Sequence, residues 1–460
     1  MKVLLLSPNI ERLPDPVFPL GLASIAAVLR DHEIPYKILD LCFADDYEDA
    51  IEKTLTQFRP DVVGLSLRNV DNVSYPNYIS YLPFYEKVVQ TIRTHSNASI
   101  VLGGSGFSLL PQPLIDFLQA DFGIVGEGES AFVRLLEQMQ KKEPPQERII
   151  EGYHERGEKL DALPFPDRSH FDNEAYLRWG GMGNVQTKRG CPFRCVYCTY
   201  PIIEGRQMRL RSPDLVCDEI EDLLMRGIDN IFIVDNTFNY PIHHAEDICG
   251  EIIRRRLTIK WSCYATPGLV TEALIDRMMT AGCTGVEFGS DAANNEMLRN
   301  MGKDFTVENL QSASSICRKA DMPFCHSLLL GGPGETMETV QETLNTIDLL
   351  SPTAAIAMVG IRVFPKTRLS AIARDDGVIS PDEDFLKPVF YLSTAVKNKV
   401  LPYMENFVKS HANWILPGLN VHISTELQRK LRRFGLKGPL WEHMKRDHKF
   451  KKETRLHQEE

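Results

Sequence analysis

The strongest constraint on the fold is a repeated alternation between short apolar runs and longer stretches with helical periodicity. In the first 145 residues, each apolar run ends in a polar or glycine-containing turn and is followed by an amphipathic stretch. Strands that alternate with helices form βαβ units, which place the strands parallel in one sheet. The predicted strands of this region are residues 3–6, 37–41, 62–66 and 99–102.

A second alternating region follows a polar stretch, residues 141–158, which contains a Pro-Pro pair typical of a linker. Its strands and intervening helices occupy about 190 residues, too few for a closed barrel of eight units. We therefore predict a partial (βα)6 barrel, and a mainly helical C-terminal region where the alternation stops. The predicted barrel strands are residues 184–187, 230–234, 260–264, 285–288, 324–330 and 355–363.

Length and composition fit a multidomain α/β protein with a sizeable core. The 460 residues are 43% hydrophobic and carry a formal charge of −10, which argues against a general nucleic-acid binder. No apolar run is long enough for a membrane span, and the apolar start is too short for a signal peptide. The basic tail, 445–455, is interpreted as a solvated terminus. The predicted division is residues 1–145, a linker at 146–178, residues 179–375, and a cap at 376–460.

Three of the ten cysteines stand close together, as Cys191, Cys195 and Cys198, directly after a predicted strand. The other seven are scattered, which is too sparse for a secreted disulfide framework and indicates a reducing cytoplasm. Thiolates at such short spacings bind the irons of a [4Fe–4S] cluster, and three of them leave one iron open. Structural zinc is the alternative, but the next histidines, His243 and His244, are about 45 residues away.

The segment Arg189-Gly190-Cys191-Pro192, with Cys195, Tyr197 and Cys198, closely resembles the radical S-adenosylmethionine (SAM) enzymes. The resemblance implies a partial βα barrel in which the three cysteines bind the [4Fe–4S] cluster and SAM chelates the open iron. An electron from the reduced cluster then cleaves SAM to a 5′-deoxyadenosyl radical.

The resemblance continues at the ends of later predicted strands, where the family presents polar groups and glycines toward SAM. Glycines let the backbone approach a ligand closely, and strand-end polar side chains bind hydroxyl or ammonium groups. The residues implied as SAM contacts are Tyr197, Asp235, Asn236, Gly289, Ser290, Gly331, Gly332 and Arg362.

The first region resembles a Rossmann-like cobalamin-binding domain fused ahead of a radical SAM core. No G-x-G-x-x-G opens its first helix and no P-loop lysine follows a glycine loop, so dinucleotides and nucleoside triphosphates are not supported. Small residues at the strand ends would open a groove for the dimethylbenzimidazole tail. The implied cobalamin contacts are Asp40, Ser66, Leu67, Arg68, Asn69, Gly103, Gly104, Gly126 and Glu127.

One departure concerns the lower face of the cobalt. Proteins that ligate cobalt with histidine carry D-x-H-x-x-G, but this chain has Cys42 at the histidine position and Asp45 at the glycine position. The histidine-ligated mode is therefore not expected. The loop at residues 68–72 either lies under the cobalt or is a polar surface loop.

The resemblance implies a cobalamin-dependent radical SAM methyltransferase that modifies an unactivated carbon through a 5′-deoxyadenosyl radical and methylcobalamin. One alternative is an oxidative cyclase or rearrangement enzyme that uses cobalamin without methyl transfer. A non-enzymatic alternative is a cobalamin and iron–sulfur sensor. A methylthiotransferase would need further cluster cysteines before Cys191, where only Cys42 occurs.

The substrate is not specified beyond a small molecule, lipid or peptide, and the expected reductant is flavodoxin or ferredoxin. The region 381–414 is expected to cap the site. Its aromatic residues, Phe385, Phe390, Tyr391 and Trp414, either line an apolar substrate site or belong to the core.

Overall fold

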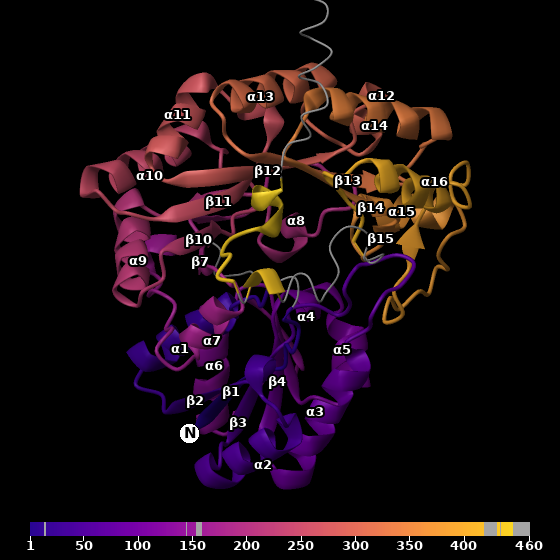
Figure 1. Cartoon of the computed structure of the whole chain (residues 1–460). Coiled ribbons are helices and arrows are strands. Elements are labelled where there is room, and N and C mark those ends of the chain that lie inside the picture. Colours follow the sequence, from indigo (N-terminus) through magenta and orange to yellow (C-terminus); the bar gives the residue numbers. More distant parts are fainter. Residues whose placement is uncertain (13–14, 144, 153–158, 418–429, 433, 445–460) are drawn as a thin grey trace, which may run out of the picture.

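The first region folds into a six-stranded sheet of strand order β2-β1-β3-β4-β5-β6, with every pair parallel. The computed structural model describes residues 1–460 except 13–14, 144, 153–158, 418–429, 433 and 445–460. Helices cover both faces of the sheet, which explains why its strands are continuous apolar runs (Figure 1). The strands are β1 (Val3–Ser7), β2 (Tyr36–Asp40), β3 (Val62–Ser66), β4 (Ser99–Gly103), β5 (Phe122–Val125) and β6 (Ile149–Glu151). The helices are α1 (Leu20–Asp31), α2 (Tyr47–Phe58), α3 (Leu82–His95), α4 (Ser105–Leu109), α5 (Pro111–Phe117) and α6 (Glu129–Gln140).

The second region forms a seven-stranded sheet in the order β17-β14-β13-β12-β11-β10-β7, again parallel throughout. Within the described structure, the edge strands β7 and β17 do not pair with each other, so the barrel is open as predicted. The strands are β7 (Gly183–Val185), β10 (Asn230–Ile233), β11 (Lys260–Ala265), β12 (Cys283–Asp291), β13 (Phe324–Leu330), β14 (Ala354–Val359) and β17 (Trp414–Ile415). The helices on its outer face are α9 (Pro213–Met225), α10 (Ile242–Arg255), α11 (Glu272–Thr280), α12 (Asn295–Asn300), α13 (Val307–Lys319) and α14 (Met337–Leu350).

Shorter elements connect the two sheets and complete the C-terminal region. They are η1 (Leu41–Phe43), η3 (Leu160–Ala162), α7 (Asn173–Arg178), β8 (Lys188–Arg189), α8 (Tyr200–Ile203), β9 (Arg209–Leu210), η4 (Pro267–Leu269), β15 (Ile361–Arg362), α15 (Arg368–Asp375), β16 (Phe390–Tyr391), α16 (Val400–Phe407), η5 (Val408–Ser410) and η6 (Leu440–His443). None of the helices in the described part of the chain has the length and apolar character that crossing a membrane requires.

Two short strands depart from the predicted division. β6 pairs with β5 and extends the first sheet past residue 145, into the stretch predicted as linker. β17 pairs with β14, so the predicted cap contributes a strand to the barrel. The described part of the cap is mixed rather than mainly helical, and the basic tail lies outside the described residues.

The aromatic residues of the cap lie in the core rather than on an open surface. Phe385, Tyr391 and Trp414 are all buried, and Phe390 packs beside them at partial exposure. The core interpretation of these side chains is therefore the one that the structure favours.

The two domains share one apolar core. Leu67 and Phe107 of the first domain belong to the same buried cluster as Val196, Met301 and Leu369 of the second. Beside this cluster, the buried Arg362 Nε donates to Asp71 Oδ2 at 2.9 Å, across the domain interface. The domains are therefore fixed relative to one another by apolar packing and by a buried ion pair.

Arg362→Met is expected to lower the free energy of unfolding by about 3–5 kcal/mol, because it leaves the Asp71 carboxylate buried without its partner. Chemical denaturation of the variant and the parent protein measures this change. Arg254→Met is the control, since its ion pairs with Glu251 and Asp214 are on the surface and should contribute little. Equal stability of the two variants would show that the interface does not depend on the buried pair.

Candidate active site

The three clustered cysteines lie on the loop between β8 and α8, and all three are free thiols. The loop is held by the segment after α12, where the amide of Val196 donates to the carbonyl of Met301 at 3.0 Å. The next residue, Gly302, approaches so closely that a Cβ there would lie 2.4 Å from the carbonyl oxygen of Arg194. The loop is thus anchored to the barrel by main-chain contacts.

Burial makes the three thiols weak acids. It raises the pKa of Cys191 to about 11 and that of Cys198 to about 12, and it also raises the pKa of Cys195. Binding to metal replaces such protons with positive charge. Across the described residues, no three His, Cys, Asp or Glu side chains come close enough to hold a single metal ion. Thiolates of an iron–sulfur cluster bind different irons and lie further apart than ligands of one zinc, so the loop fits a cluster better.

A lysine and an aspartate complete the surroundings of this loop, and sequence analysis did not identify either. Lys303 Nζ lies 2.5 Å from Asp291 Oδ2, and the hydroxyl of Tyr197 donates to the same oxygen at 2.5 Å. Burial alone would lower the pKa of Lys303, but Asp291 and Cys195 raise it, so the ammonium stays charged. Asp291 could have been predicted, because it directly follows the strand-end residues Gly289 and Ser290. Lys303 is not part of any recognisable sequence motif.

Two of the predicted strand-end residues offer groups to a ligand. Asn236 Nδ2 donates to the carbonyl of Gly190 at 2.7 Å, while the buried Asn236 Oδ1 has no hydrogen-bond partner within the described structure. Gly289 is exposed, and a Cβ placed there would meet no atom within 4 Å. An unpaired acceptor and an open backbone position therefore lie on the side of the barrel that carries the cysteine loop.

Three other predicted side chains are already engaged within the protein. Asp235 accepts from the amide and hydroxyl of Thr187, at 2.7 and 2.5 Å, and is buried. Ser290 Oγ is 2.7 Å from Nδ1 of the buried His326. Arg362 binds Asp71, as described above. This geometry does not support direct contact of these side chains with a cofactor; it gives them a supporting position behind the strand ends.

The glycines after β13 are held by a buried carboxylate. The amides of Gly331 and Gly332 both donate to Glu335 Oε2, the second at 3.0 Å, while Glu335 Oε1 has no partner among the described residues. Burial raises the pKa of Glu335 to about 7, although the two amides lower it in part. Glu335 was not among the residues predicted from the sequence, although it follows the predicted Gly331 and Gly332 closely in the chain.

The raised pKa of Glu335 predicts a specific pH dependence of stability. Its folded pKa lies above the ordinary value of 4.5, so its favourable contribution is complete below pH 4.5 and is lost as the pH rises toward 7. The loss should amount to about 3 kcal/mol, at 1.36 kcal/mol per pKa unit. Glu335→Gln is expected to remove this slope, and unfolding free energies measured across that pH range test it. Superimposable pH profiles for variant and parent protein would contradict the assignment.

A pocket of about 290 Å³ opens at the carboxyl ends of the first sheet, between the two domains. The predicted residues Ser66, Gly103, Gly104, Gly126 and Glu127 all line it. Its other wall comes from the second domain, through Gln186, Arg189, Ile203 and Glu204. The pocket is therefore an interdomain site whose far side leads directly to the cysteine loop.

Glycine is required at one of these positions and keeps space open at another. Gly104 has a φ of +94°, and a Cβ there would lie 2.6 Å from the carbonyl oxygen of Leu67. A Cβ at Gly103 would meet nothing within 4 Å, so any larger side chain would project into open space. Gly104 permits the close turn, and Gly103 leaves room in the pocket.

The remaining predicted contacts of the first domain lie outside this pocket. Asp40 accepts from the hydroxyl of Tyr176 at 2.6 Å, and the side chain of Leu67 is fully buried in the core. Arg68 and Asn69 are exposed on the loop after β3. The charge of Arg68 acts on the pKa values of Tyr200 and Tyr264 in the second domain, which places this loop opposite the barrel.

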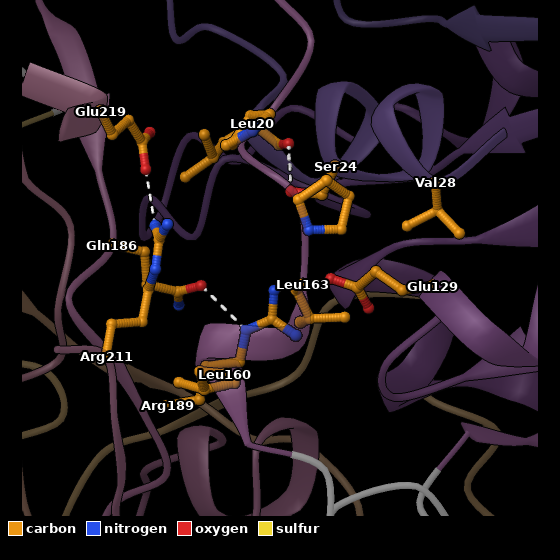
Figure 2. A pocket seen from close by; sticks show the side chains of 12 residues that line it. Leu20, Ser24, Val28, Glu129, Leu160, Leu163, Gln186, Arg189, Arg211 and Glu219 are labelled. Carbon is orange, nitrogen blue, oxygen red and sulfur yellow. Dashed lines mark hydrogen bonds and ion pairs between the residues drawn. The ribbon is translucent and has the colours of Figure 1, made fainter. Parts of the chain in front are cut away.

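Ion pairs join the pocket to the cysteine loop. Glu127 lies 3.0 Å from Arg189 and also pairs with Arg209, and Glu129 lies 2.6 Å from Arg189. Arg189 and Glu129 also line an adjoining cavity of about 30 Å³. Figure 2 shows them across this cavity from Leu20, Ser24 and Val28 of α1. Arg189 precedes the cysteine loop directly, so the turn at residues 126–129 and the loop are mechanically connected.

Comparison with known proteins assigns a family to each of the two sheets. Residues 7–136 match the B12 binding domain, and residues 185–347 match the Radical SAM superfamily. The chain is 26% identical to tryptophan 2-C-methyltransferase of Streptomyces laurentii, over 82% of this chain and 75% of the relative. It is 24% identical to cytidylyl-2-hydroxyethylphosphonate methyltransferase of Streptomyces wedmorensis, over 85% of this chain and 84% of the relative.

Solved structures share the whole architecture. The methyltransferase TsrM from Kitasatospora setae, with cobalamin and a [4Fe–4S] cluster bound, superposes with a TM-score of 0.85. The match is 24% identical and covers 96% of this chain and 97% of that one. OxsB, a cobalamin-dependent SAM radical enzyme, superposes with a TM-score of 0.68 at 17% identity, over 85% of this chain and 64% of that one. These likenesses confirm the predicted arrangement of a parallel-sheet domain ahead of an open barrel.

Proposed function

Because this chain belongs to the radical SAM superfamily and carries a B12 binding domain ahead of the radical SAM domain, we propose that it methylates an unactivated carbon. Relatives that align along most of both chains are named as methyltransferases. The observation that carries the proposal is the shared interface: Arg189 lines the interdomain pocket and also leads into the cysteine loop. A carrier in the pocket and a cluster on the loop would thus act on the same space.

Cys191, Cys195 and Cys198 are the proposed cluster ligands, since they are free thiols on one anchored loop. When bound, the cofactors supply one-electron cleavage of SAM and a cobalt carrier for the methyl group. The Lys303 ammonium lies close enough to Cys195 to favour its thiolate, and Asp291 holds that ammonium in place. The protein therefore contributes ligands and a fixed positive charge beside them.

The proposed SAM site uses backbone and amide groups at the strand ends. Asn236 Oδ1 would accept a hydrogen bond from a ligand, and Gly289 leaves room for one to approach. The backbone of Tyr197, together with Gly331 and Gly332, would complete the walls. Asp235, Ser290 and Arg362 are proposed as positioning residues, because their side chains bind protein groups behind these strand ends.

The proposed cobalamin site is the interdomain pocket, whose size and glycine-rich lining suit a nucleotide tail. Its proposed contacts are Ser66, Gly103, Gly104, Gly126 and Glu127. Arg68 and Asn69 would lie toward the cobalt, since their loop faces the barrel. Cys42 is buried and its pKa is raised to about 12, so it is not proposed as a cobalt ligand. Asp40 and Leu67 do not line the pocket, and we propose that they support the fold of the domain around it.

Product analysis tests the proposed reaction against its main alternative. Anaerobically reconstituted enzyme, incubated with SAM, cobalamin, a low-potential reductant and a methyl acceptor, is expected to form both S-adenosylhomocysteine and 5′-deoxyadenosine. Formation of 5′-deoxyadenosine alone would favour an oxidative cyclase or rearrangement enzyme instead. No cleavage of SAM under reducing conditions would favour a sensor.

The proposed reductant is flavodoxin or ferredoxin, because the cluster needs an electron at low potential before SAM is cleaved. We also propose that the enzyme works in the reducing cytoplasm, where an open iron is protected from oxidation. The substrate is proposed to be a small molecule, lipid or peptide.

A further inference from the structure

The inner face of the barrel sheet carries side chains that the preceding assignments leave unused. Along each strand, alternate residues face the helices and are buried, as Cys263, Val286 and Phe288 are. The residues between them face the inside of the barrel. Tyr264 of β11 is 37% exposed, and Glu287 of β12 is partly exposed beside it at the same register. The inner face is therefore not packed shut at this level.

Glu287 is a carboxylate that has no cationic partner within the described part of the chain. The hydroxyl of Ser327, on the neighbouring strand, donates to Glu287 Oε1 at 2.5 Å, and the side chain of Trp441 also contributes a hydrogen bond. Burial raises the pKa of Glu287, and no positive charge among the described residues offsets this burial. A cationic group or a further N–H donor that entered this space would therefore stabilise the carboxylate.

An aromatic pair lies on one side of the same carboxylate. The ring of Tyr264, on the strand next to Glu287, lies 5.1 Å from the ring of Phe232 in an edge-to-face arrangement, and Phe232 is on β10, one strand further away. The negative charge of Glu287 is also the largest influence on the pKa of Tyr264, which confirms that the two side chains are close. A planar ring bearing a positive group would find both an apolar wall and a counter-charge here.

The floor beneath Glu287 is built from the C-terminal segment. Trp441 of η6 packs against Cys325 and Ala354, near the amino ends of β13 and β14. A Cβ at Gly285 would lie 2.9 Å from the ring of Trp441, so the strand approaches this ring closely. In Figure 1 the yellow segment runs from the first domain to the barrel strands, consistent with the ion pair between Arg432 and Asp15. Glu287 thus lies between a closed floor and the strand ends that face the cysteine loop.

We propose that Glu287 determines substrate choice by binding the amine of an aromatic amine, with Tyr264 and Phe232 against the ring. This inference rests on the proposed function, since it places the substrate inside the barrel. Glu287 precedes the strand-end Gly289 by two residues, or about 7 Å at 3.3 Å per residue. A substrate held by its amine at Glu287 would therefore project its remaining carbon atoms toward the cofactors. Glu287 was not predicted from the sequence, because a single glutamate in a buried strand belongs to no motif.

Two matched probes distinguish the contribution of the amine charge to binding from the contribution of the aromatic ring. Tryptamine and indole-3-propionate carry the same ring on a two-carbon chain, and they differ in the charge at its end. Calorimetric titration of the reconstituted holoenzyme is expected to show tryptamine binding at least 10-fold more tightly than indole-3-propionate. Glu287→Gln should abolish this preference, and Ser327→Ala should reduce it. Glu272→Gln, whose carboxylate lies on the surface beside Lys319, should keep it.

Equal binding of the two probes to the parent enzyme, no measurable binding of tryptamine, or an unchanged preference in Glu287→Gln would each overturn the assignment. Thermal unfolding of each variant verifies that it is folded, and Ser327→Ala provides a second variant if Glu287→Gln is unstable. Transfer of methyl from SAM to cobalamin by the parent enzyme is measured separately, without probe. Its absence would contradict the proposed function, whereas a lost probe preference alone would contradict only the role of Glu287.

Discussion

Replacing Cys191, Cys195 and Cys198 together by alanine is expected to remove the iron–sulfur absorbance and to lower the rate of SAM cleavage by about 1,000-fold or more. The three thiols are free and lie on one loop, where they are the proposed ligands of the cluster. Without them, SAM would have no reduced iron to receive an electron from. Iron and sulfide content, together with 5′-deoxyadenosine formation after anaerobic reconstitution, measures the effect.

Cys217→Ala is the matched control. Cys217 is fully buried in the core between the barrel and its helices, so its loss should cost about 1 kcal/mol of stability and leave the iron content unchanged. The triple variant should still bind cobalamin, because the interdomain pocket does not include the three cysteines. Full iron content in the triple variant would show that the cluster is held elsewhere.

Gly103→Leu is expected to weaken cobalamin binding by at least about 100-fold, or about 2.7 kcal/mol. A Cβ at this position meets no protein atom within 4 Å, so the added side chain should fill the pocket without disturbing the sheet. The cluster should remain, since none of the three cysteines lines this pocket. Equilibrium binding of cobalamin, followed by its visible absorbance, measures the change.

Two neighbouring substitutions serve as controls for this steric effect. Gly103→Ala adds only a methyl group and should reduce binding much less than leucine does. Gly104→Ala should instead destabilise the fold, because its positive φ and the nearby carbonyl of Leu67 leave no room for a side chain. If Gly103→Leu binds cobalamin as the parent protein does, the pocket is not the cobalamin site.

The sequence predicted the two-sheet architecture because long apolar runs and helical periodicity are local signals. In the two large sheets, the prediction missed β5, β6 and β17, which have only four, three and two residues. Such strands form because a neighbouring strand offers an edge, and pairing with a distant segment leaves no local pattern. β17 in particular depends on β14, which lies far away in the chain.

The site was predictable where a motif carried it and not where side chains meet only in three dimensions. The cysteine spacing and the glycine turns were visible in the sequence, and the glycines at residues 103, 104 and 126 do meet in one pocket. Asp235 and Ser290 occupy the expected strand ends, but burial turns their side chains toward protein partners. Lys303 and Glu287 were missed, since each depends on a partner from a different element.

The central claim is that cobalamin in the interdomain pocket carries the methyl group. It is tested most directly with SAM labelled with ¹³C in its methyl group and reduced, reconstituted enzyme. The account predicts that the label appears on protein-bound cobalamin and then in the product when an acceptor is supplied. Consumption of SAM to 5′-deoxyadenosine, with no label on cobalamin at any time, would contradict it.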